Sequence, residues 1–242
     1  MGSGLPDFRV RLSRRARRGR LRVGPLGRVE VVLPAGADPA IAERLVAEQS
    51  AWVRTQQQRI RQRRGDDPDL HPSRPACVHL PALGEQWPVT YTGGERTVVR
   101  EGDGGLRVTA PGEAAVREGL RRWLQRRAKA ILPDWAQQGS AETGLGFRKL
   151  SVRGQKGRWG SCSRAGNLSL NRNLLFLEPA AVRYLLVHEL AHTEHPDHSP
   201  AFWARVAELE PDYRRLDARL NQAAARLPLW VHAEEEIPAE SV

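Results

Sequence analysis

Residues 187–199 read "VHELAHTEHPDHS". This stretch decides the fold because its histidines continue an apolar segment that the rest of the protein must bury. It contains four of the chain's seven histidines, namely His188, His192, His195 and His198. The apolar run begins after Glu178 and Pro179, a pair typical of a helix N-terminus. At about 3.6 residues per turn, His192 lies about 40° around the helix from His188. We therefore expect a buried helix whose histidines point into one pocket.

The spacing H-E-x-x-H within this stretch is typical of a zinc site. Two histidines four residues apart lie one helical turn apart, so both imidazoles can reach a single ion. Glu189 flanks the pair and can reach a metal-bound water without binding the metal itself. The pattern also occurs by chance on ordinary helices. On a buried helix, however, these polar side chains would be costly without a shared purpose, which favours a metal site.

The identity of a third zinc ligand depends on Pro196. His195 lies on the same helix face, but about 10 Å along the axis from His188 at about 1.5 Å per residue. The residue before a proline is pushed out of the helical conformation, so we expect the helix to end near residues 193–195. The chain can then turn back and bring His198 to the open side of the ion.

A carboxylate is the rival for the third position. Glu208 or Glu210, on the helix expected next, could coordinate the ion instead. We favour His198, because H-E-x-x-H-x5-H is the spacing by which compact zincins complete a three-histidine site. His195 would then lie beside the ligands or towards the substrate. Three ligands leave a fourth position open, which is typical of a catalytic rather than a structural zinc site.

Strand and helix patterns alternate along the rest of the chain, which indicates an α+β fold. Strands are expected within 8–33, 78–110 and 147–176, the last with a hairpin turn at "RAGN", residues 164–167. Helices are expected at 38–64, at 112–138, after Ser199 and at 212–226. We predict that the first of these buries Ile41, Leu45, Trp52 and Ile60. Pro133 is expected to kink or split the second.

The composition is ordinary for a soluble globular protein, with 40% hydrophobic and 27% charged residues. No apolar run approaches the length of a membrane span, and no apolar segment follows the basic N-terminus as in a secretory signal. Cys77 and Cys162 lack a partner at metal-ligand spacing, so we expect two reduced thiols. Together these features predict a cytoplasmic protein that does not associate with membranes.

The formal net charge is +10, and nearly all the basic residues are arginines. The densest group lies in residues 9–22, with arginines at positions 9, 11, 14, 15, 17, 18, 20 and 22. Such a segment could contact the phosphates of DNA. The competing interpretation is an arginine-rich composition with solvated side chains. We prefer the second interpretation here, because a basic segment is only a weak motif.

Several motifs together give a resemblance to a known family. They are "RWGSCS" at 158–163, "LSLNRNLLF" at 168–176, "YLLVHELAH" at 184–192 and "HPDHSPAFW" at 195–203. With upstream matches over roughly 8–221, they resemble the YgjP-like zinc metallopeptidases, relatives of the SprT-like zinc proteases. Two departures from the family pattern are "DHS" in place of its N-H-S/G element, and Asn173 where a tryptophan is usual. Neither removes an expected ligand.

This resemblance implies a compact zincin core, a sheet packed on the H-E-x-x-H helix, extended at the N-terminus by strands and a helix. The histidine of the N-H-S/G element, a metal ligand in the family, corresponds to His198. We expect an N-terminal β-rich region with a long helix at 1–110, the metallopeptidase core at 111–226 and a loose tail at 227–242. An exposed loop is expected at 64–76.

The predicted function is that of a zinc-dependent metallopeptidase or other amide hydrolase. His188, His192 and His198 would hold zinc, and Glu189 would act as the general base. An extended protein or peptide substrate would lie beside "RWGSCS" as an edge strand. Candidates for stabilising an oxyanion are Tyr184, His195, Arg158 and Tyr213. The alternative is a SprT-like protein that acts on or binds protein–DNA complexes, with its basic N-terminus on the phosphates.

Overall fold

A computed structural model describes residues 5–24, 26–64, 74–155 and 157–232. The chain divides into two compact units. Unit 1 comprises residues 1–70, 224–226 and 232–242, and unit 2 comprises residues 71–223 and 227–231. Residues 71–110 thus belong with the histidine-rich segment, and not with the N-terminal strands as the sequence suggested. Most of the expected loop (65–73) and tail (233–242) lie outside the described residues.

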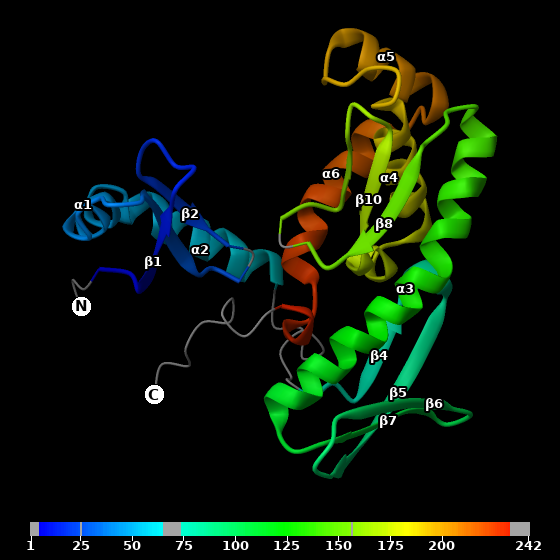
Figure 1. Cartoon of the computed structure of the whole chain (residues 1–242), viewed down its shortest axis with the longest axis horizontal. Helices are drawn as coiled ribbons and strands as arrows, with labels where there is room; N and C mark the ends of the chain where they lie inside the picture. The colour runs from blue at the N-terminus through cyan, green and yellow to red at the C-terminus, as the bar shows by residue number, and fades with distance from the viewer. Residues whose placement is uncertain (1–4, 25, 65–73, 156, 233–242) are drawn as a thin grey trace. The chain divides into compact units, whose positions relative to one another are not determined.

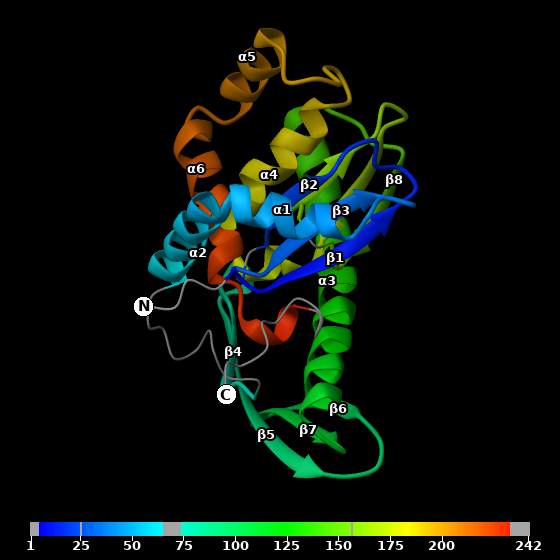
Figure 2. The same cartoon turned by 90° about the vertical axis from the view of Figure 1, so that its left-hand side faces the viewer.

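Unit 1 is built on a three-stranded sheet (Figures 1 and 2). Its strands are β1 (Phe8–Ser13), β2 (Arg20–Val23) and β3 (Val29–Pro34). Strand β3 is central, parallel to β1 and antiparallel to β2. Val29, Val31 and Leu33 of β3 are fully buried in one apolar cluster with Ala42, Val46 and Val53 of the helices that follow. The expected N-terminal strands are confirmed.

The single long helix expected at 38–64 is two helices, α1 (Ala40–Glu48) and α2 (Ser50–Arg64). Gln49 between them leaves the helical conformation, with φ −108° and ψ 14°. The predicted apolar stripe is confirmed in part: Ile41 and Leu45 pack against the apolar cluster. The fully buried positions, however, are Ala42, Val46 and Val53, and 45% of Trp52 is exposed. Smaller side chains thus face the sheet in both helices.

Unit 2 contains a four-stranded sheet in the order β4-β5-β7-β6. The strands are β4 (Cys77–Leu80), β5 (Glu85–Gly93), β6 (Val98–Gly102) and β7 (Gly105–Ala110). The long helix α3 (Glu113–Thr143) packs on this sheet in one apolar core, in which Trp87 of β5 meets the edge of Trp123. The indole N–H of Trp123 donates to the Glu101 carboxylate over 2.7 Å. These contacts explain why residues 71–110 belong to unit 2.

Helix α3 is longer than the sequence predicts and is not split by Pro133. It continues through the proline to Thr143 and ends at Gly144, which has a positive φ of 71°. Figure 1 shows that the axis of α3 bends along its length. A proline removes one helical hydrogen bond and crowds the preceding turn, so it accounts for a bend without a break.

A second sheet of unit 2, in the order β8-β10-β9, lies beside the histidine-rich helix. Its strands are β8 (Lys149–Arg153), β9 (Gly160–Cys162) and β10 (Asn167–Asn171). Gly166, with φ 71°, forms the expected turn between β9 and β10. Helices α4 (Pro179–Ala191), α5 (Pro200–Leu209) and α6 (Tyr213–Ala223) complete the unit (Figure 1). The mixed sheets and helices confirm the α+β class.

Within the described ranges, none of the helices has the length and apolar character needed to cross a membrane.

Gly105 offers a test of this packing. Its φ is +112°, and a Cβ there would lie 2.2 Å from the Pro88 carbonyl oxygen of the neighbouring strand. We predict that Gly105→Ala destabilises the protein by at least about 2 kcal/mol, through backbone strain and the clash. Gly104→Ala is the matched control, since a Cβ there meets nothing within 4 Å. Equal midpoints of the two variants in urea unfolding would contradict the prediction.

Candidate metal centre and active site

Helix α4 carries the polar site within an apolar environment. Nine of its thirteen residues are buried, among them Tyr184, Leu186 and Leu190. Glu178 and Pro179 open the helix, as the sequence predicts. Packing against α3, α5, α6 and β9 therefore fixes α4 on most of its circumference.

The turn after α4 returns the chain to the histidines. The helix proper ends at Ala191, two residues before the predicted range, although the His195 N–H still donates to the Ala191 carbonyl over 2.9 Å. The chain then turns at Pro196, and the Asp197 carboxylate accepts the Ser199 N–H over 3.1 Å. The Ser199 hydroxyl caps α5 by accepting the Phe202 N–H. His198 lies between these two turns.

This turn brings three histidines together. One ring nitrogen from each of His188, His192 and His198 lies within 4.8 Å of the other two. The Nε2 atoms of His188 and His198 are 3.2 Å apart. Two nitrogen ligands on a tetrahedral zinc ion, each at about 2.0–2.1 Å, would be roughly 3.3 Å apart. The spacing therefore fits a single small ion, and the exposed ring of His198 leaves the cluster open on one side.

Hydrogen bonds fix which nitrogen each helix histidine offers. His192 Nδ1 lies 3.0 Å from the His195 carbonyl oxygen, which can only accept, so Nδ1 carries the proton. His188 Nδ1 lies 3.4 Å from the Tyr184 hydroxyl, which itself donates to Asp217 over 2.9 Å. Asp217 also accepts from Asn221 over 2.9 Å. Both helix histidines thus have an unprotonated Nε2 available to a metal.

The electrostatics favour neutral imidazoles at the cluster. Burial lowers the pKa of His188 to about 4, with further lowering by His192 and His198. Burial also lowers the pKa of His192. Metal coordination requires the deprotonated ring, so these histidines are prepared for an ion near neutral pH.

Aromatic side chains from α5 and α6 form one wall of the cluster. Phe202 stacks on His192, with ring centroids 4.4 Å apart, and meets the rings of His188 and His198 edge-on. Trp203 contacts His198 at 5.7 Å and stacks on Tyr213 at 5.5 Å. This wall restrains the rotamers of the histidines.

Glu189 is held between α4 and the edge strand β9. Only 6% of its surface is exposed, and its carboxylate accepts the backbone N–H of Cys162. A Cβ on Gly160 would lie 2.7 Å from Glu189 Oε1, so only glycine lets the strand approach this closely. Burial raises the pKa of Glu189 to about 7, opposed by the Cys162 N–H and by Arg158. A carboxylate poised near neutrality can accept and return a proton.

The remaining candidates from the sequence have other contacts. His195 contributes its carbonyl oxygen to His192, and the Tyr184 hydroxyl lies on the Nδ1 side of His188, away from Nε2. The Tyr213 hydroxyl accepts from Arg214. The rival ligands Glu208 and Glu210 pair with Arg205 and Arg183, respectively. Burial and the charge of Glu189 raise the pKa of the Cys162 thiol, so it stays neutral.

Sequence reasoning missed the positioning roles of Gly160, Tyr184 and Asp217. Tyr184 precedes His188 by four residues, so helical spacing could have placed the two side by side. Gly160 and Asp217 carry no such local signal, because each meets the site only through the packing of β9 and α6 on α4.

Comparison with known proteins agrees with this geometry. A family model described as the YgjP-like metallopeptidase domain matches residues 17–223. The chain belongs to the YgjP-like family. It is therefore a metal-dependent hydrolase of proteins or peptides, as the resemblance of its motifs implied.

Among solved structures, the chain is similar to the crystal structure of the metallopeptidase zymogen of Pyrococcus abyssi abylysin. The two are 25% identical, the TM-score is 0.36, and the match covers 41% of this chain and 100% of that chain. No curated protein matches the chain.

Gly160 provides a test of how the YgjP-like site holds its carboxylate. We predict that Gly160→Ala displaces Glu189 and lowers peptidase activity about 100-fold, because an error of about 1 Å at a reacting group costs that much. Cleavage of an unfolded protein substrate measures the effect. Gly157→Ala is the control, since a Cβ there meets nothing within 4 Å. Similar activity in both variants would show that Gly160 does not position Glu189.

Proposed function

We propose that this YgjP-like protein is a zinc peptidase in which His188, His192 and His198 hold the ion and Glu189 is the general base. One observation carries the proposal: three imidazole nitrogens converge within 4.8 Å on a helix whose buried carboxylate lies against an edge strand. A structural zinc site would have no use for such a carboxylate, whereas hydrolysis needs one.

The donor set supports zinc. Imidazole nitrogens suit zinc and several other transition metals, and three ligands with an open fourth position are typical of catalytic zinc. Bound zinc would supply a Lewis acid that polarises a peptide carbonyl and makes an attacking water more acidic. Tyr184, Asp217 and the His195 carbonyl would orient the ligating rings through their Nδ1 atoms.

Glu189 would move the proton. Its carboxylate would take a proton from the attacking water and pass it to the nitrogen that leaves when the peptide bond breaks. The Cys162 N–H and the charge of Arg158 favour its ionised form against the effect of burial. The adjacent backbone of Gly160 would prevent the carboxylate from turning away.

The open edge of β9 would bind the substrate. β9 is an outer strand of its sheet, and the backbone groups of Trp159 and Ser163 pair with Asn171 and Asn167 around β10. Backbone groups alternate in direction along a strand, so Gly160 and Cys162 direct theirs to the free edge. The bond from Cys162 to Glu189 places the base at this same edge. An extended peptide pairing there would lie beside the base.

Zinc dependence is tested by separating binding from chemistry. We predict that Glu189→Gln keeps stoichiometric zinc but loses at least about 100-fold in cleavage of an unfolded protein, because only the proton acceptor is removed. His198→Ala should lose zinc as well. His195→Ala is the matched control and should keep zinc, since only its backbone contacts a ligand. Metal analysis of protein purified without added zinc measures the zinc content, and cleavage assays measure the activity. A full complement of zinc in His198→Ala would refute the proposed ligand set.

The Tyr184–Asp217 pair gives a second prediction. Asp217→Asn should weaken zinc binding about 10- to 100-fold, because the Tyr184 hydroxyl loses its charged acceptor and orients His188 less well. Competition with a chromophoric chelator measures the dissociation constant directly, without any activity. Asp212→Asn, an exposed carboxylate on a surface arginine, is the control. Unchanged zinc affinity in Asp217→Asn would contradict the role of the pair.

A further inference from the structure

Arginines are concentrated in the N-terminal part of the chain. Residues 5–64 contain 15 arginines and five carboxylates, and the rest of the chain contains 23 basic and 23 acidic residues. Residues 5–64, which form the strands and helices of unit 1, therefore carry a net charge of +10 over 60 residues. Unit 2, residues 71–223 and 227–231, has 22 basic and 16 acidic residues, a net charge of +6 over 158 residues. Positive charge is therefore much denser along residues 5–64 than in unit 2.

Within unit 1, strand alternation sorts the arginines onto one face of the sheet. Val29, Val31 and Leu33 of β3 point into the apolar cluster with α1 and α2. Successive side chains of a strand point to opposite faces, so the residues between them form the other face. On that face Glu30 has Arg9 and Arg22 as its neighbours in register, and Val32 has Arg11 and Arg20. Two arginines of β1 and two of β2 thus flank the central strand.

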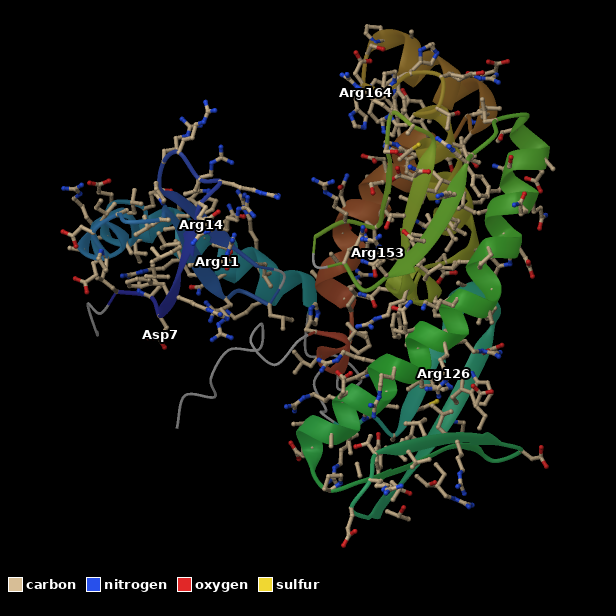
Figure 3. The ribbon with its side chains drawn as sticks, in the orientation of Figure 1. Asp7, Arg11, Arg14, Arg126, Arg153 and Arg164 are labelled. Atoms are coloured by element: carbon tan, nitrogen blue, oxygen red, sulfur yellow. The ribbon has the colours of Figure 1, made fainter. Side chains whose placement is uncertain are left out.

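This arginine face, defined by Arg9, Arg11, Arg20 and Arg22, is open to solvent. All four arginines are exposed. Helices α1 and α2 pack on the opposite, apolar face of the sheet. Neighbouring strands are about 4.8 Å apart, so the two rows are about 10 Å apart, with roughly 6.7 Å between successive side chains in a row. The loop joining β1 to β2 adds Arg14, Arg15, Arg17 and Arg18; Figure 3 labels Arg11 and Arg14.

The chemistry of the face selects its partner. Guanidinium groups bind phosphate oxygens in pairs, so rows of arginines suit a regular polyanion. No aromatic side chain belongs to the register of this face, because Phe8 is in register with buried Val29 and packs on the apolar cluster. Single-stranded nucleic acids are bound chiefly by stacking on aromatic rings. The exposed apolar residues of β1, Val10 and Leu12, align with the apolar side of β3, so this face has no group to insert into a bilayer.

We propose that the arginine face binds the phosphate backbone of a duplex nucleic acid without reading its sequence. Glu30, whose carboxylate accepts from Arg11 Nε over 3.0 Å, is the one acidic group in register on this face and weakens binding by occupying that arginine. The binding is independent of the proposed zinc chemistry, which belongs to unit 2. Neither the family description nor that of the solved structure mentions a nucleic acid.

Salt-dependent binding of the full-length protein to a fluorescent 30-base-pair DNA of random sequence tests the proposal. Four phosphate contacts predict a contribution of about −3.6 to the slope of log affinity against log salt, or about 150-fold in affinity between 50 and 200 mM salt. The variant with Arg9, Arg11, Arg20 and Arg22 all changed to Gln should lose most of this slope. Glu30→Gln should bind several-fold more tightly, an effect that a damaged fold would not produce.

The control variant changes four exposed arginines of unit 2 to Gln, namely Arg100, Arg107, Arg126 and Arg153. These substitutions lower the net charge by the same amount as those of the arginine face. It should bind DNA like the wild type, and Glu189→Gln should do so too. Equal losses in the two fourfold variants, with both folded by circular dichroism, would reduce the effect to net charge and overturn the proposal. Tighter binding to single-stranded DNA, to phosphatidylserine vesicles or to polyglutamate than to the duplex would also overturn it.

Discussion

The hydrogen bond from the Cys162 N–H to the buried carboxylate of Glu189 is the constraint on which the catalytic unit depends. A carboxylate that is 6% exposed is costly unless it is paired, and here the pairing requires the backbone of β9 to touch α4. That contact is possible only because residue 160 is glycine. The same contact holds Glu189, the proposed base, at the free edge of the sheet, where we propose that a substrate binds.

The other polar groups of α4 also need hydrogen-bond partners. His188 has Tyr184 and Asp217 behind it, and His192 has the His195 carbonyl. Every Nδ1 of the helix histidines is thereby occupied, and the Nε2 atoms are left pointing towards His198. The Nε2 atoms of His188 and His198 lie 3.2 Å apart and are the groups that the proposed metal ion would use.

The two units differ in chemistry as well as in fold. Unit 2 has a large apolar core around a few buried polar groups, as expected for a framework that holds precise distances between them. Unit 1 is small and carries a sheet face of arginines that contributes nothing to its apolar cluster. Mutual repulsion of these like charges opposes compactness, so the folding of the unit does not by itself explain such a face.

Much of the catalytic helix could be predicted because its signals are local. Helical spacing placed His188 and His192 on one face, and Pro196 predicted the turn that lets His198 approach them. The first helical region was harder. Two apolar stripes, one residue apart, run along residues 40–60, and the sheet selected the one with Ala42, Val46 and Val53. Pro133 failed to divide α3, because burial of Leu132 and Ala136 on either side of it stabilises the continuous helix.

The sequence by itself determined the α+β class, the strand order along the chain and the residue types of the site, because these follow from periodicity and from proline and glycine positions. The tertiary structure alone decided the partners: Gly160 beneath Glu189, Asp217 behind Tyr184, residues 71–110 on α3, and four arginines on one sheet face. Such contacts join residues 8 to 42 positions apart, and strand register and helix packing determine which of these residues meet.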